Sequence, residues 1–166
     1  IRDDNPVIFM EQETMYGMKG EVPDDPDFTI PIGVADIKRE GTDCTIVARS
    51  FTVPQALQAA EKIQAEFDVS VEVIDPRTIK PLDIDTIVNS IKKTNRLVIA
   101  EESHEFASVG AEISYQVMDH AFDYLDAPIR RISTAEAPMP YAKNLEAAAL
   151  PSVDKIVAAV KEVCYL

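Results

Sequence analysis

The sequence predicts an α/β fold with three layers, in which helices cover both faces of a mostly parallel five-stranded sheet with one antiparallel edge strand. One observation is the order of patterns from Ile30 onward, where short apolar runs typical of strands alternate with helical stripes. A second is the turn signal at 41–43, which lies between the alternating run Ile30–Ile37 and Cys44–Ala48. It predicts a hairpin and therefore the antiparallel edge.

The first helix is expected to begin at Thr52, a good capping residue, with Pro54 in its first turn. Its apolar stripe recurs every three or four residues, at Leu57, Ala60, Ile63 and Phe67. The alternating run Val69–Ile74 follows and predicts the next strand.

Asp83 is expected to cap the second helix, whose buried face is Ile84, Ile87, Val88 and Ile91. Arg96–Ala100 predicts a central strand, and a helix from Gly110 to Met118 follows it. The remaining elements are a strand over Ala127–Ile132 and helices over Lys143–Ala149 and Ser152–Val163. Pro138 and Pro140 hold the chain out of helix until the first of these begins.

The first 29 residues differ in composition from the rest. Pro6–Met10 has the pattern of a short buried strand, whereas residues 11–29 are polar, contain two glycines and two prolines, and predict a linker. Because the chain opens at Ile1 without an initiator Met, a signal pattern or a presequence, we expect it to be the C-terminal piece of a longer polypeptide.

The charge limits the classes of partner. Twenty-nine acidic residues against 16 basic ones give a net charge of −13, which disfavours nucleic acid and anionic membranes and favours a basic protein surface. No apolar run approaches the ~20 residues that span a bilayer. Cys44 and Cys164 are expected to be two reduced thiols.

Polar loops follow three of the expected strands, at 75–78, 101–105 and 133–136, and should meet at one edge of the sheet. His104 lies beside carboxylates, which is the composition of an acid/base pair, but a single His in an acidic loop is more typical of an ordinary surface residue. Ser108–Glu112 places small residues and Gly110 at a helix start, which suits either anion binding by free N–H groups or close packing on the sheet.

The opening residues contain hard oxygen ligands. The Ile1 carbonyl, the Asp3 carboxylate and the Asn5 amide oxygen are groups that alkali and alkaline-earth cations prefer. The alternative for the same residues is a polar loop that enters a strand.

Several motifs carry a resemblance to a known family. Asp75–Asp83 (DPRTIKPLD), Glu101-Glu102 after the next strand, and Val109–Ile113 at a helix start resemble the C-terminal domain of the transketolase superfamily. Three further motifs narrow the resemblance to the beta subunits of the decarboxylating component of pyruvate dehydrogenase: Arg2–Pro6, Leu125–Pro128, and Pro138–Ala142 followed by Leu145-Glu146.

Pro138-Met-Pro-Tyr stands where the branched-chain oxoacid relatives typically have Pro-Phe-Pro-His, which favours pyruvate. The loop Glu101–Ser108 departs from relatives that often have an aromatic residue and more glycine there.

The resemblance implies a heterotetramer of two alpha and two beta subunits. This enzyme decarboxylates pyruvate on thiamine diphosphate with Mg²⁺ and transfers the acetyl group to lipoyl-lysine of the acetyltransferase. Its catalytic glutamate lies in an upstream pyrimidine-binding domain, so this stretch should hold no catalytic and no cofactor-binding residue. The implied division is 1–10 for the last strand of that domain, 11–29 for the linker, and 30–166 for the transketolase C-terminal domain.

The resemblance also implies site residues. Ile1, Asp3 and Asn5 would be potassium ligands. Asp126 and the carboxylate of Leu166 would bind the basic peripheral subunit-binding domain of the dihydrolipoamide acetyltransferase, and the domain would also contact the alpha subunit and a second beta subunit. The enzyme would work in a bacterial cytoplasm or, alternatively, in the mitochondrial matrix.

Two alternatives remain open at this point. One is the C-terminal domain of a transketolase or deoxyxylulose-phosphate synthase, which the residues from Pro138 to Glu146 disfavour. The other, from a different class, is a free-standing flavodoxin-like module that binds an anion at the Gly110 helix start.

Overall fold

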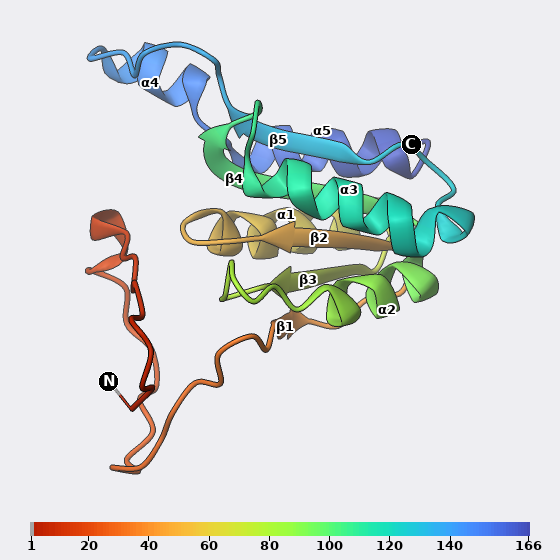
Figure 1. Cartoon of the computed structure of the whole chain (residues 1–166). Coiled ribbons are helices and arrows are strands. Elements are labelled where there is room, and N and C mark those ends of the chain that lie inside the picture. Colours follow the sequence, from red (N-terminus) through yellow and green to blue (C-terminus); the bar gives the residue numbers. More distant parts are fainter. Residues whose placement is uncertain (1) are drawn as a thin grey trace.

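The computed structural model describes residues 2–166, and its elements follow the expected strand and helix order (Figure 1). The strands are β1 (Asp36–Arg39), β2 (Cys44–Ala48), β3 (Val71–Asp75), β4 (Leu97–His104) and β5 (Arg130–Thr134). The α-helices are α1 (Thr52–Phe67), α2 (Ile84–Thr94), α3 (Val109–Ala121), α4 (Lys143–Ala149) and α5 (Val153–Val163). Two short 3-10 helices are η1 (Glu13–Met15) and η2 (Phe122–Tyr124).

The five strands form one sheet in the order β1-β3-β2-β4-β5. β2 pairs in parallel with both β3 and β4, and β4 pairs in parallel with β5. β1 lies antiparallel to β3 at one edge. The predicted fold class, a mostly parallel five-stranded sheet with one antiparallel edge strand, is therefore confirmed.

The predicted hairpin is wrong, although the edge strand itself exists. β1 pairs with β3 (Asp36 opposite Asp75) and not with β2. The reason is that β2 is buried along its whole length and lies between β3 and β4, so neither of its edges is open to β1. The turn instead binds the residue before β3: Thr42 and Asp43 both donate backbone N–H groups to the carbonyl of Ser70.

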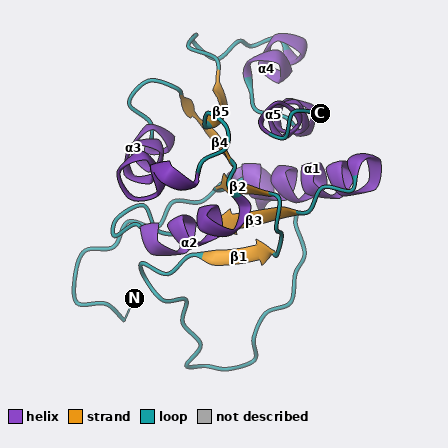
Figure 2. Ribbon diagram, turned by 90° about the vertical axis from the view of Figure 1, so that its right-hand side faces the viewer, coloured by secondary structure: helices purple, strands orange, loops and turns teal. Residues whose placement is uncertain are grey.

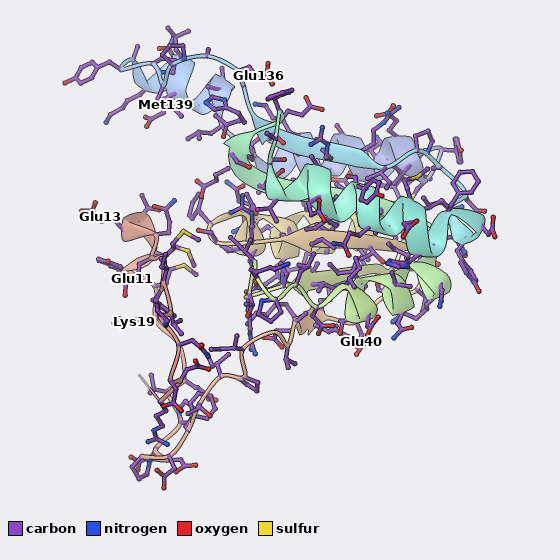
Figure 3. All side chains as sticks on the ribbon, viewed as in Figure 1. Glu11, Glu13, Lys19, Glu40, Glu136 and Met139 are labelled. Carbon is purple, nitrogen blue, oxygen red and sulfur yellow. The ribbon has the colours of Figure 1, made fainter. Side chains whose placement is uncertain are left out.

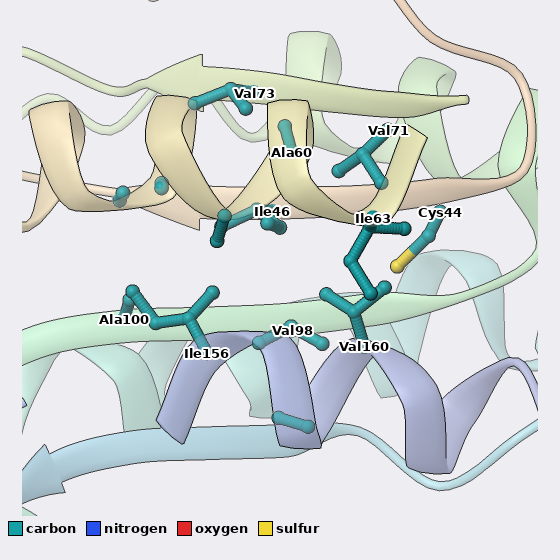
Figure 4. Close-up of a cluster of buried hydrophobic side chains, with 14 of the residues drawn as sticks. Cys44, Ile46, Ala60, Ile63, Val71, Val73, Val98, Ala100, Ile156 and Val160 are labelled. Atoms are coloured by element: carbon teal, nitrogen blue, oxygen red, sulfur yellow. The ribbon is translucent and has the colours of Figure 1, made fainter. Parts of the chain in front are cut away.

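Helices cover both faces of the sheet (Figure 2). On one face α1 and α5 pack on the strands through a core that includes Ile46, Ile63 and Val160 (Figure 4). On the other face α2 and α3 enclose a second cluster, which includes Ile74 and Ile91. These two apolar layers hold the strands in register because each removes one face of the sheet from water.

The helix starts agree with the sequence in one case and differ in another. Asp83 caps α2 as predicted, because its carboxylate accepts the N–H of Thr86. Thr52 does not cap α1; it is the first helical residue, and Phe51 precedes it. Its buried hydroxyl lies 2.8 Å from the carbonyl of Ala100 in β4, so it fastens the helix to the sheet.

Some strand boundaries also differ. β4 runs on to His104, beyond the predicted end at Ala100, and β5 begins at Arg130 where Ala127 was expected. The helices predicted over Lys143–Ala149 and Ser152–Val163 are present as α4 and α5. α4 projects from the body, and Met139 lies on the segment that leads into it (Figure 3).

The strand predicted over Pro6–Met10 is not formed in the structure. These residues have no regular secondary structure, and the side chains of Ile8 and Phe9 are 87% and 82% exposed. Within residues 2–166 no strand pairs with them, and an isolated extended segment is not stable as a strand. We call residues 2–29 the N-terminal arm. It runs apart from the sheet and its helices, as the labelled Glu11 and Lys19 show (Figure 3).

The N-terminal arm contacts β4 through the side-chain amide of Gln12, which donates to the Glu102 carboxylate at 2.9 Å.

None of the helices formed by residues 2–166 is both long enough and apolar enough to cross a bilayer.

Candidate functional site

Glu101 is not a loop residue, as the sequence suggested, but a buried residue of β4 that is 1% exposed. One of its oxygens accepts from the guanidinium of Arg49 at 3.0 Å. Both oxygens lie 3.1 Å from the backbone nitrogen of Gly110, in the first turn of α3. The positive end of this helix is therefore matched by a carboxylate of the protein itself.

The Glu101 carboxylate is held in its ionised form. Burial raises its pKa, but hydrogen bonds from Ser108, Arg49, Ser103 and the Gly110 N–H outweigh that effect, and the net pKa lies below its ordinary value. A Cβ at Gly110 would lie 2.3 Å from a Glu101 oxygen, so only glycine fits here. The structure thus favours close packing over anion binding for this helix start.

His104 has the surroundings of a surface residue. It is exposed at the end of β4, and its Nδ1 lies 3.0 Å from the carbonyl oxygen of Ala135.

The two predicted partner-binding residues, Asp126 and Leu166, are exposed and lie in segments that contact each other. The hydroxyl of Tyr165, the residue before Leu166, donates to the carbonyl of Asp126 at 2.9 Å. The Asp126 side chain is 59% exposed, and Leu166 is 51% exposed. We call Asp126 and Leu166 together the acidic corner.

The last turn of α5 fixes the direction of the chain end. The N–H of Leu166 donates to the carbonyl of Lys161, and the N–H of Tyr165 donates to that of Glu162. Tyr165 has a φ of 58°, which completes the left-handed helix ending known as a Schellman motif. A residue with a Cβ is disfavoured in this conformation, so the hydrogen bond of the Tyr165 hydroxyl helps to hold it.

Arg96 is a functional candidate that sequence reasoning missed. Its guanidinium donates to the carbonyl of Val163 at 3.0 Å and to that of Asp43 at 3.2 Å, and a third nitrogen lies 3.7 Å from the Asp126 carboxylate. The only sequence signal was a cation directly before the apolar run Leu97–Ala100. That pattern is common at strand starts and identifies none of these partners.

An exposed apolar surface lies along α3 and η2, the elements that precede Asp126 in the chain. Along α3 and η2, Tyr115, Met118 and Phe122 are 69%, 46% and 61% exposed, at the three- and four-residue spacing of one helix face. Tyr124 and Tyr165 are also exposed, and Asn95 donates to the carbonyl of Tyr124 at 2.8 Å. We call the residues Tyr115, Met118 and Phe122 the α3 stripe.

Of the three predicted potassium ligands, Ile1 lies outside the described residues. Asp3 and Asn5 are close together, and one Asp3 oxygen accepts both the backbone N–H and the side-chain amide of Asn5. These bonds, the backbone one first, lower the pKa of Asp3. That oxygen accepts two hydrogen bonds within this segment. Potassium binding by these residues stays a prediction.

In the described part of the chain, no three His, Cys, Asp or Glu side chains gather as metal ligands. Cys44 is buried and Cys164 is half-buried, and both are free thiols.

Residues 33–156 match the family described as "Transketolase, C-terminal domain". Over 165 residues the chain is 52% identical to "Pyruvate dehydrogenase E1 component subunit beta" of Rhizobium meliloti, covering 99% of this chain and 36% of that protein. The protein of the same name from Rickettsia felis is 56% identical over 165 residues, with 99% and 50% covered.

The mitochondrial protein of that name from Dictyostelium discoideum is 52% identical over 166 residues, with 98% of this chain and 46% of that protein covered. The chain therefore spans half or less of the length of these relatives.

Solved structures give the same fold. "Split gene transketolase, inactive beta4 tetramer" superposes with a TM-score of 0.72 at 25% identity, covering 86% of this chain and 45% of that one. A 2-oxoglutarate:ferredoxin oxidoreductase from Magnetococcus marinus matches with a TM-score of 0.51 at 16% identity, covering 83% and 20%, which supports the fold alone. With its residues 33–156 matched and its sheet shared with a transketolase, this chain belongs to the transketolase C-terminal domain family.

Proposed function

We propose that this chain is the C-terminal part of the beta subunit of a thiamine-diphosphate-dependent pyruvate dehydrogenase, where it serves subunit association and docking of the acetyltransferase. The identity above 50% to proteins of that name over nearly the whole chain supports the assignment. The whole enzyme would carry out the oxidative decarboxylation of pyruvate and pass the acetyl group to lipoyl-lysine. Relatives with bacterial and with mitochondrial names are equally similar, so both compartments fit.

The chemistry would lie outside this stretch. The Gly110 helix start, which a diphosphate would otherwise suit, already donates to Glu101, so the residues present do not fit thiamine diphosphate. We propose that the cofactor and its Mg²⁺ bind in the preceding half of the polypeptide and at the alpha subunit. The same contact weighs against the flavodoxin-like anion-binding module.

The exposed apolar residues at the N-terminal end support the proposed division of the chain. The sequence pattern of residues 6–10 is typical of a buried strand, but its large apolar side chains are 51–87% exposed: Val7, Ile8, Phe9 and Met10. We propose that residues 1–10 complete a sheet in a preceding pyrimidine-binding domain and that residues 11–29 link it to the domain of residues 30–166. Potassium at Ile1, Asp3 and Asn5 would belong to that junction.

The acidic corner is the proposed contact for the acetyltransferase. The observation that carries this proposal is the hydrogen bond from Tyr165 to the Asp126 carbonyl, which brings Asp126 beside the chain end. Two separately attached carboxylates at one corner suit a basic peripheral subunit-binding domain, because charge complementarity speeds encounter and charged hydrogen bonds fix the docked register.

The α3 stripe is the proposed contact for a second beta subunit. Three large apolar side chains on one helix face are costly to leave in water, and burying them against the same surface of a second copy would remove that cost. The structural relative titled as a beta4 tetramer is consistent with association between such subunits.

Binding of the peripheral subunit-binding domain to the assembled enzyme tests the docking proposal. Asp126→Asn, which deletes a carboxylate, or removal of Leu166, which moves the terminal carboxylate back to Tyr165, should weaken binding by about 1–3 kcal/mol, as expected when a charged hydrogen-bond partner is lost or displaced. Asp85→Asn is the matched control, because it removes the same charge from an exposed residue in the first turn of α2, outside the proposed docking surface. Equal affinity of parent, Asp126→Asn and the truncated form would reject the docking assignment.

A further inference from the structure

We propose that Arg96 is the positioning residue of the acidic corner: it holds Asp126 and the chain end in the arrangement that a basic partner meets. This inference rests on the proposed docking function. In this role Arg96 sets the geometry of the acidic corner and contacts no partner itself.

Arg96 joins three segments that are far apart in sequence. It donates to the carbonyl of Asp43, in the turn before β2, and to the carbonyl of Val163, the last residue of α5. Its third contact is the Asp126 carboxylate, in the segment that leads to β5. Its side chain is only 26% exposed, so the guanidinium is held between these segments.

The chemistry of arginine is necessary for this role. A planar guanidinium presents several N–H donors in fixed directions and reaches separate acceptors at once, whereas the ammonium of lysine is a single compact donor centre. A cation at the carbonyl of Val163 also opposes the partial negative charge at the C-terminal end of α5. Arg96 therefore stabilises the helix end from which Tyr165 and Leu166 extend.

The contact with Asp126 is looser than the two contacts with carbonyls. At 3.7 Å it exceeds hydrogen-bonding distance, while the carbonyl contacts are 3.0 and 3.2 Å. Asp126 is fixed mainly through its backbone, since its N–H donates to Asn95 and its carbonyl accepts from Tyr165. Its carboxylate, 59% exposed, thus keeps acceptor sites for a partner cation beside the looser ion pair with Arg96.

The test uses Arg96→Gln and Arg96→Lys in the full-length subunit, assembled with its alpha partner. The matched control is Lys62→Gln, which makes the same charge change as Arg96→Gln at an exposed ion pair with Asp154, in the first turn of α5 and so at the opposite end of that helix from Val163. Two quantities are measured: the rate at which a carboxypeptidase releases Leu166 and Tyr165, and the dissociation rate of the peripheral subunit-binding domain.

Both Arg96 variants should release the terminal residues about 5–30-fold faster than the parent, and the bound domain should dissociate faster by a similar factor, which corresponds to about 1–2 kcal/mol. Lys62→Gln should leave both rates unchanged. Arg96→Lys keeps the charge, so loss of function in this variant identifies the geometry of the guanidinium as the cause. It also preserves the test if thermal unfolding shows that Arg96→Gln does not fold.

Unchanged release of Leu166 in both variants would overturn the inference. Faster release with unchanged docking would also overturn it. In that case the Asp126→Asn result separates the two proposals: if Asp126→Asn weakens docking, only the role of Arg96 is wrong, and if it does not, the docking function itself is wrong.

Discussion

The hydroxyl of Tyr165 donates a 2.9 Å hydrogen bond to the backbone carbonyl of Asp126, 39 residues earlier in the chain. This bond joins the end of α5 to the segment before β5, two elements that the sequence places far apart. Because Tyr165 has a φ of 58°, which is unfavourable for a residue with a Cβ, the bond also compensates for backbone strain. The position of the acidic corner therefore depends on contacts of the last two residues, Tyr165 and Leu166.

Tyr165→Phe tests this contact directly. The change removes the hydroxyl and keeps the ring, so it should lower the free energy of unfolding by about 0.5–1.5 kcal/mol, the usual contribution of one hydrogen bond. Urea denaturation followed by circular dichroism measures the difference. Tyr115→Phe, at an exposed tyrosine of α3, is the control and should be close to neutral; equal effects of the two changes would argue against a specific role of Tyr165.

Gly110→Ala should destabilise the domain by about 1–3 kcal/mol, the range for an overpacked core. The new Cβ would meet the Glu101 carboxylate at 2.3 Å and a methyl group of Ile99 at 3.1 Å. Gly20→Ala is the matched control, since a Cβ there has nothing within 4 Å. The midpoint of thermal unfolding checks both variants, and an unperturbed Gly110→Ala would mean that Glu101 does not lie against this helix.

The acid stability of the domain should depend on Glu101. Its pKa is lower in the folded state than in the unfolded state, so its ionised form contributes stability above the unfolded pKa, and this contribution is lost as the pH falls through the folded pKa. Since an unperturbed Glu titrates at about 4.3, the loss should occur below about pH 4.

Glu101→Gln should therefore flatten the fall in the urea midpoint between neutral pH and about pH 3, although it lowers stability at neutral pH. Glu66→Gln, at an exposed residue of α1, should keep the slope of the parent. A parent and a Glu101→Gln variant with the same slope would show that the carboxylate is not held ionised by its neighbours.

Asp83→Ala should cost about 0.5–2 kcal/mol of unfolding free energy through loss of the helix cap. Its two oxygens accept the N–H of Thr86 at 3.1 Å and the N–H of Ala35 at 2.8 Å, so it also fastens the segment before β1 to α2. Asp85→Ala, at the second residue of the helix, loses only a favourable helix-dipole term and should cost less. Urea denaturation measures both losses of unfolding free energy, and equal losses in the two variants would contradict the role of Asp83 as the helix cap.

The sequence predicted the elements whose signals are local. The cap at Asp83 and the apolar face with Ile87 and Ile91 suffice to place α2, and they do so correctly. The predicted hairpin is wrong because the choice of partner strand is not a local property. A turn at Gly41 is compatible with pairing to several strands, and both edges of the buried strand β2 are already paired with β3 and β4.

The residues of the candidate site divide in the same way between local and long-range signals. Asp126 and Leu166 could be named from a family resemblance, but their placement depends on Tyr165 and Arg96, whose partners are 30 to 67 residues away. Likewise, nothing in the Gly110 segment reveals that Glu101 occupies its N–H group, because that contact forms only when α3 packs on β4. Long-range polar contacts of this kind leave no periodic signal in a sequence.

Amide hydrogen exchange of the assembled enzyme, with and without the peripheral subunit-binding domain, tests the central claim most directly. If the acidic corner is the docking surface, added domain should slow exchange at residues 122–127 and 163–166 and leave the β1 edge and α4 unchanged. Protection confined to other surfaces, with exchange at these two segments unaltered by a saturating amount of the domain, would contradict the account.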